Sequence, residues 1–99
     1  MDSINEGKFR DEMQRGAQAE RLLSDALFKE AFATVEDKLR SGWLATLDDQ
    51  ERERERLWLM LKLLERVKGH IVAVMQTGQF ASKSLSDIEQ RKTRLGFRR

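Results

Sequence analysis

At 99 residues, the chain is long enough for one domain, but its core would be small and a shared interface between subunits would help to stabilise it. Charged residues make up 36% of the chain and hydrophobic residues 39%, which is typical of a folded helical protein and excludes a disordered one. The absence of cysteine excludes disulfides and thiolate metal sites, and the absence of proline favours long helices over a turn-rich β fold.

The first predicted helix lies in residues 8–44, after a frayed N-terminus at residues 1–7. Apolar residues recur in it at steps of three and four, as on one face of an amphipathic helix. Gly16 is expected to weaken or break this element, because glycine costs about 1 kcal/mol in a helix interior. The more secure helix is therefore about 17–41, and 8–15 is a weaker extension or a separate turn.

A second helix is predicted over residues 47–77. Gly42 is the first stop signal before it, and the hydroxyl of Thr46 can accept from the free N–H groups at its start. Gly78 is expected to end it as a left-handed cap. Because the connection is short, the two helices are expected to be antiparallel neighbours.

The apolar face of this second helix is wider than a monomer of this size needs. One row of side chains follows steps of four and three, interrupted only at Lys68, and further apolar residues lie on both sides of it. Such a helix must bury more than one side, so we expect it to contact its own chain and a second copy, most simply in a dimer. The expected oligomer interface consists of Leu57, Leu61, Leu64, Ile71 and Met75.

A third, shorter helix is predicted over residues 84–94, because Ser84 with Asp87, or Ser86 with Glu89, has the spacing of a capping box. The whole chain is therefore predicted to be a single all-α domain. It would form a long antiparallel helical hairpin plus a short C-terminal helix, completed as an oligomeric helical bundle.

Positive charge gathers toward the C-terminus. Residues 1–50 carry seven Lys or Arg against eleven Asp or Glu, and residues 51–99 carry twelve against six. The basic tail at residues 95–99 and the residues before it form either a solubilising, poorly ordered end or a weak contact with nucleic acid or an acidic partner. The residues that would make this contact are Arg91, Lys92, Arg94, Arg98 and Arg99.

No group of residues predicts catalysis. His70 is the only histidine, and in an apolar helix segment it is expected to be a partly buried structural residue, with proton transfer as the alternative. Neither a zinc-binding H-E-x-x-H helix nor a glycine-rich phosphate loop is present. We therefore expect a non-enzymatic protein without catalytic residues, cofactor or metal.

Two further features have alternative interpretations. The alternating glutamate and arginine of residues 51–56 would bury nothing as a strand, so we interpret the run as a solvated helix start, with a charged clamp on a partner as the alternative. Trp43 and Trp58 are interpreted as packing residues, with a binding hot spot as the alternative.

One combination of residues extends over a little over half of the chain. It consists of Leu22, Leu23, Leu27, Phe28, Glu30, Ala31, Phe32, Trp43, Thr46, Asp49, Arg54, Glu55, Arg56, Leu57, Trp58, Lys62, Val67, Gly78, Phe80 and Ala81. This combination resembles small all-helical proteins that are common in tailed-phage and prophage genomes. The resemblance implies a phage context near genes for DNA packaging and head assembly, and it implies no catalytic residues.

The leading hypothesis is a phage assembly protein that acts in DNA packaging or virion structure through contacts with itself and with other assembly proteins. The alternative is a small phage inhibitor that binds a host protein, such as an anti-defence or transcription-blocking factor. Either would act in the cytoplasm of an infected bacterium, and the first would also occur in the virion. No membrane association is expected, because no stretch approaches the roughly 20 apolar residues of a span and the acidic start is unlike a signal peptide.

Overall fold

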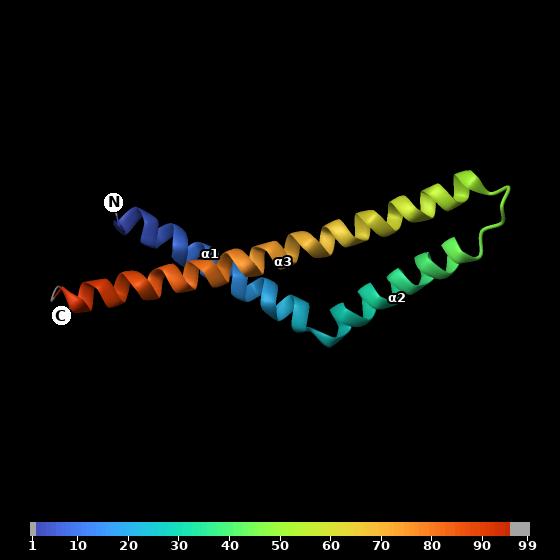
Figure 1. Ribbon diagram of the computed structural model, residues 1–99. Coiled ribbons are helices and arrows are strands. Elements are labelled where there is room, and N and C mark those ends of the chain that lie inside the picture. Colours follow the sequence, from blue (N-terminus) through green and yellow to red (C-terminus); the bar gives the residue numbers. More distant parts are fainter. Residues whose placement is uncertain (1, 96–99) are drawn as a thin grey trace. The chain divides into compact units, whose positions relative to one another are not determined.

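The computed structural model describes residues 2–95, which form three α-helices and contain no strand. Helix α1 spans Asp2–Ser24, α2 spans Ala26–Leu44 and α3 spans Glu51–Arg94 (Figure 1). The all-α prediction is therefore confirmed. No helix in this part of the chain is long and apolar enough to cross a membrane.

The helices belong to two compact units. The terminal unit combines residues 2–21 with residues 72–95 of the described chain, and the central unit comprises residues 22–71. Helix α3 contributes its second half to the terminal unit and its first half to the central unit.

The first helical region is interrupted at Asp25, and the expected break at Gly16 is absent. Asp25 has an extended backbone, with φ −66° and ψ 129°, and its Oδ1 accepts a hydrogen bond of 2.9 Å from the N–H of Phe28. An aspartate that bonds the backbone in this way caps the following helix and competes with continuation of the preceding one. The predicted fraying of the N-terminus is also absent over residues 2–7, where α1 is already helical.

Helix α3 continues through the position at which the sequence predicted its end. Gly78 lies inside the helix, and the expected separate helix over residues 84–94 is its continuation. The two capping-box serines are therefore interior residues. Gly78 does not adopt a left-handed conformation; its role is a close contact with α1.

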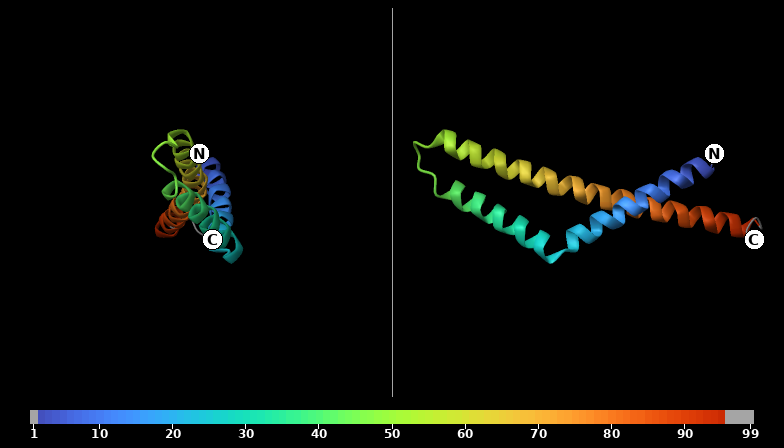
Figure 2. Two further views of the ribbon diagram at one scale, coloured as in Figure 1. Left: turned by 90° about the vertical axis from the view of Figure 1, so that its right-hand side faces the viewer. Right: turned by 180° about the vertical axis from the view of Figure 1, so that it is seen from behind.

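In the central unit, α2 lies alongside the first half of α3 (Figures 1 and 2). A Cβ atom placed on Gly42 would lie 3.4 Å from Cδ1 of Leu57, so this glycine brings the two helices close together. The expected helix start near residue 47 is four residues too early, because residues 45–50 form the connection. Thr46 does not cap α3: its hydroxyl donates to the carbonyl oxygen of Trp43 at 2.7 Å.

Arg54 of α3 holds this connection in place by two hydrogen bonds. Its Nε donates to Oγ1 of Thr46 at 3.1 Å, and its Nη2 donates to the carbonyl oxygen of Leu47 at 2.6 Å. One member of the Glu–Arg run therefore has a structural role that the alternating pattern did not reveal. Within residues 2–95, no ion pair is formed by any of residues 51–56.

In the terminal unit, α1 crosses the second half of α3 at two glycines (Figure 1). A Cβ atom on Gly16 would lie only 2.6 Å from Cα of Gly78. Ala19 and Ala81, each three residues beyond one of these glycines, are the buried hydrophobic residues of the described chain. Small side chains thus let the two backbones approach closely.

Candidate protein-protein interface

The central unit contains no buried residue, although it carries many large apolar side chains. Monomeric soluble proteins rarely leave an extended apolar surface open to water, and such surfaces mark interaction sites. Helix α3 contributes most of this surface. Its exposed large apolar residues in the central unit are Trp58, Leu59, Met60, Leu63 and Val67.

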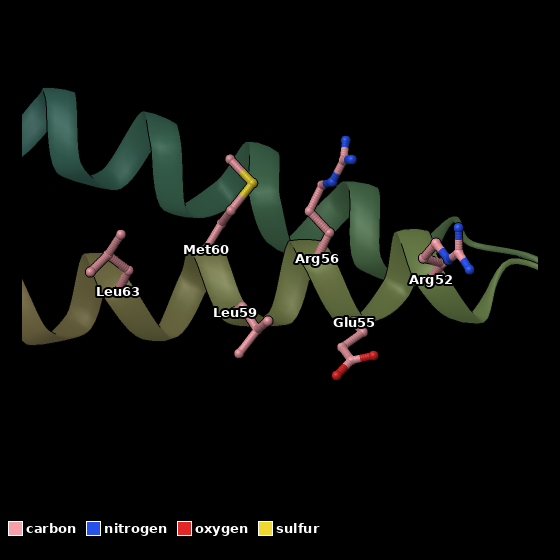
Figure 3. Close-up of a pocket in the computed structure, with 6 residues that line it drawn as sticks. All are labelled: Arg52, Glu55, Arg56, Leu59, Met60 and Leu63. Carbon is pink, nitrogen blue, oxygen red and sulfur yellow. The ribbon is translucent and has the colours of Figure 1, made fainter.

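Leu59 and Leu63 form a short ridge on α3, with exposed fractions of 53% and 63%. They lie one turn apart, and each borders two shallow hollows of the central unit. The first hollow is lined by Arg52, Glu55, Arg56, Leu59, Met60 and Leu63 (Figure 3). The second is lined by Trp58, Leu59, Lys62, Leu63, Glu65 and Arg66.

The side chains of the first hollow point in different directions around α3. In Figure 3, Met60 and Arg56 point toward the side on which α2 lies, whereas Leu59 and Glu55 point away from α2. The surface centred on Leu59 is therefore the side of α3 that α2 leaves uncovered. We call this surface the outer face of α3; it comprises Glu55, Leu59, Lys62, Leu63 and Arg66.

The row that the sequence assigned to an oligomer interface occupies the other side of the helix. Leu57, Leu61 and Leu64 are half-buried, and Leu57 meets Gly42 of α2 within the same chain. Ile71 and Met75 are also half-buried, Ile71 at the end of the central unit and Met75 in the terminal unit. The structure thus places Leu57 against α2, half-buries Leu61 and Leu64 on the same side of the helix, and leaves Leu59 and Leu63 exposed. The excess width of the apolar pattern was the signal for this second face.

The two tryptophans are partly exposed. Trp43 lies in the last turn of α2, and Trp58 lies in the first half of α3 with Nζ of Lys62 5.5 Å from its ring centroid. A cation at this distance from an indole ring is attracted by its electrons. Lys62 also forms an ion pair of 3.5 Å with Glu65, so the second hollow is bordered by a connected polar cluster.

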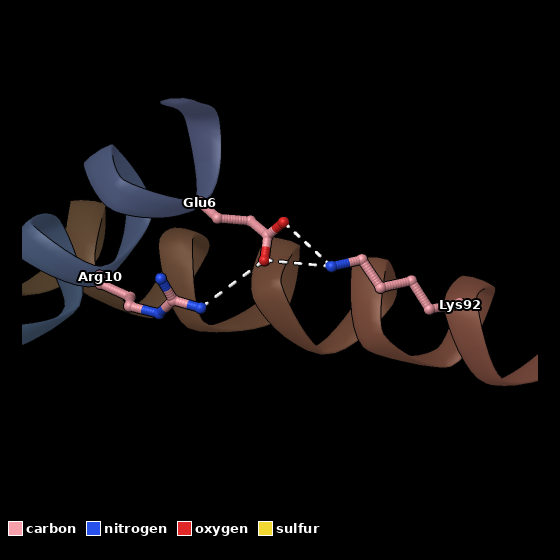
Figure 4. Close-up of polar contacts among 3 residues, drawn as sticks. All are labelled: Glu6, Arg10 and Lys92. Carbon is pink, nitrogen blue, oxygen red and sulfur yellow. Dashed lines mark hydrogen bonds and ion pairs between the residues drawn. The ribbon is translucent and has the colours of Figure 1, made fainter. Parts of the chain in front are cut away.

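The basic residues assigned to nucleic-acid or acidic-partner contact do not form one free patch. Nζ of Lys92 lies 3.1 Å from Oε1 of Glu6, whose side chain is largely buried and also lies 3.6 Å from Arg10 (Figure 4). Arg91 and Arg94 are exposed in the last turns of α3. The predicted contacts Arg98 and Arg99 lie outside the described residues. Because Lys92 is paired within the chain, less positive charge is open to a partner than the sequence suggested.

His70 is exposed, contrary to the expected partly buried position. It lies on α3 where the helix has no cover on that side, so its apolar neighbours in sequence do not surround it in space. Among residues 2–95, no group of three or more histidines or carboxylates is placed to hold a metal ion.

Comparison with known proteins identifies no family for this chain. No protein-family model matches the chain, and no curated protein or solved structure matches it either.

Proposed function

We propose that this chain is a non-enzymatic helical assembly protein of a tailed phage, acting in DNA packaging or virion structure through protein–protein contacts. The observation that carries the proposal is the surface of the central unit, where residues 22–71 bury no side chain completely and expose a series of large apolar ones. Two adjacent helices cannot enclose a core of their own, so their stability depends on further helices packed against them.

A partner protein would supply those helices. In the proposed assembly, the hairpin formed by α2 and the first half of α3 is completed as an oligomeric helical bundle. The phage context rests on the residues that resemble small tailed-phage proteins, most of which lie in the same central unit. The proposed place of action is the cytoplasm of the infected bacterium and, for a structural component, the virion.

Affinity purification during infection by a phage that carries the gene tests this proposal. An epitope-tagged chain is captured from infected cells, and purified virions are examined separately by mass spectrometry. Capture of capsid, portal or packaging proteins, or presence in the virion, is the expected result. Capture of one host regulator in equal amount would instead favour the inhibitor hypothesis and overturn the assembly role.

A matched pair of variants connects the result to the central unit. Replacing both ridge leucines, Leu59→Ser with Leu63→Ser, is expected to abolish capture while the circular dichroism spectrum stays helical, because both side chains are exposed. Asp37→Ser changes an exposed position of α2 and is expected to leave capture unchanged. Equal capture by both variants would show that the partner binds elsewhere.

A further inference from the structure

We infer that the outer face of α3 binds the same face of a second copy of this chain, with the two α3 helices antiparallel. The inference rests on the proposed function and specifies its first partner. A face that binds its own copy by two-fold symmetry must contain both halves of every contact. The outer face fulfils this condition in its shape and in its charges.

The shape is that of a ridge between two recesses. Leu59 and Leu63 project from α3, and a shallow hollow lies on each side of them. Helices pack when the ridge of one enters the groove beside the ridge of the other. Two copies of this face can therefore place each leucine pair in a hollow of the partner.

The charges specify the direction. Glu55 and Arg66 are eleven residues apart, which is close to three turns of helix, so they lie on the same side of α3 at the two ends of the ridge. Their midpoint falls between residues 60 and 61, beside the midpoint of Leu59 and Leu63. An antiparallel pair centred there brings Glu55 of each copy beside Arg66 of the other. A parallel pair would bring like charges together.

The charge of the whole unit also fits a second copy better than a nucleic acid. Residues 22–71 contain ten Asp or Glu and nine Lys or Arg, so the unit is almost neutral. A polyanion would be attracted by clustered positive charge, whereas the outer face has the acidic Glu55 at one end and the basic Lys62 and Arg66 toward the other. The contact is one helix wide and its apolar centre is short, so we expect a dissociation constant on the order of micromolar.

Disulfide trapping tests the direction, because the chain contains no cysteine of its own. Glu55→Cys and Arg66→Cys chains, one of them carrying a tag that changes its mass, are mixed in a glutathione redox buffer. In the antiparallel dimer the two copies of residue 55 are about 16 Å apart along the helices, too far for a disulfide. A mixed disulfide between the two variants is therefore expected, with little self-linking of either one.

Self-linking of the Glu55→Cys chain would indicate a parallel pair and overturn the inference, as would a monomer by light scattering at about 100 μM, well above the expected micromolar constant. Presence of a monomeric chain among phage assembly proteins would leave the proposed function standing while the dimer failed. A dimer that captures no phage assembly protein would support the inferred pairing and contradict the proposed function.

Charge reversal tests the ion pairs by a second route. Glu55→Arg and Arg66→Glu are each expected to weaken the dimer roughly tenfold, because each replaces two attractions with two repulsions. The double variant restores both pairs with the charges exchanged and is expected to return within about threefold of the original constant. Asp37→Arg, an equal charge change on the exposed side of α2, is the control and should leave the constant unchanged. A double variant as weak as the single ones would overturn the pairing.

Discussion

Each unit packs two helices against each other, but the side chains of the two units differ in size. In the terminal unit, α1 and α3 meet at Gly16 and Gly78, and the alanines beside them are buried. In the central unit, α2 and α3 approach each other where Leu57 lies against Gly42, and the phenylalanines and leucines of this unit are at most half-buried. Phe28 and Phe32, for instance, have ring centroids 4.6 Å apart yet remain partly accessible.

The difference shows that close contact between two helices and extensive burial of their side chains depend on different residues. Small residues let two backbones touch, so even a two-helix crossing excludes water at its centre. Large residues hold the helices apart and need atoms on every side to be buried, which two helices do not supply. The terminal unit is therefore sensitive to added volume, and the central unit is sensitive to whether a partner is present.

The largest effect is expected from Gly78→Ala. The added Cβ would lie 2.6 Å from Cα of Gly16 and 2.9 Å from the carbonyl oxygen of Glu12, and neither backbone atom can rotate away. Overpacking of this kind costs about 2–3 kcal/mol, which exceeds the gain of about 1 kcal/mol in helix propensity. Thermal unfolding followed by circular dichroism should show a Tm lowered by roughly 10 °C.

Gly69→Ala is the control in the same helix. Nothing lies within 4 Å of its added Cβ, so the helix propensity alone should raise stability by about 0.5–1 kcal/mol. If the two substitutions shifted Tm in the same direction, the tight crossing would not determine the stability of the terminal unit.

The glycines also show where sequence patterns stop being informative. Helical periodicity predicted the fold class, because spacing alone reports which residues share a face. Glycine, however, has the same signature whether it ends a helix or allows another helix to approach. Gly16 and Gly78 were assigned to breaks, and only the pairing of Gly16-x-x-Ala19 with Gly78-x-x-Ala81 could have indicated a crossing.

A second comparison separates the two faces of α3 in the central unit. Leu61→Ala removes a half-buried side chain from the row that contains Leu57, and because the site is only half-buried we expect a loss of about 1–1.5 kcal/mol in the free energy of unfolding. Leu63→Ala removes a side chain that is 63% exposed, and below the dissociation constant of the dimer the loss should stay under about 0.5 kcal/mol. Urea unfolding at low protein concentration measures both; equal losses would contradict the assignment of the faces.

The candidate interface could be predicted from the sequence only in part. The width of the apolar pattern indicated a second contact, but the sequence could not tell which row α2 covers. That choice depends on the connection at residues 45–50 and on Arg54, which donates to the hydroxyl of Thr46 and to the backbone carbonyl of Leu47, and no periodicity reports either bond. The exposure of His70 could not be predicted for the same reason, because periodicity does not report which side of α3 another helix covers.

A smaller effect is expected at the break between α1 and α2. Asp25→Ala removes the acceptor for the N–H of Phe28, and loss of such a cap costs about 1 kcal/mol. Asp25→Asn retains an acceptor and should recover most of that stability. Urea unfolding gives the values, and an alanine variant as stable as the parent would mean that the capping bond adds nothing at this junction.

The smallest effect is expected from the ion pair of the terminal unit. Lys92→Gln removes the 3.1 Å contact with Glu6, but Lys92 is 42% exposed, so water screens much of the attraction. We expect a loss of about 0.5 kcal/mol at about 0.02 M salt that disappears at about 1 M salt, where the Debye length is near 3 Å. Lys83→Gln, at an exposed position of α3 without an ion pair among residues 2–95, is the control and should change neither value. A loss at Lys92 that approached that of Gly78→Ala would mean that charge, and not the close approach of two glycines, holds the terminal unit together.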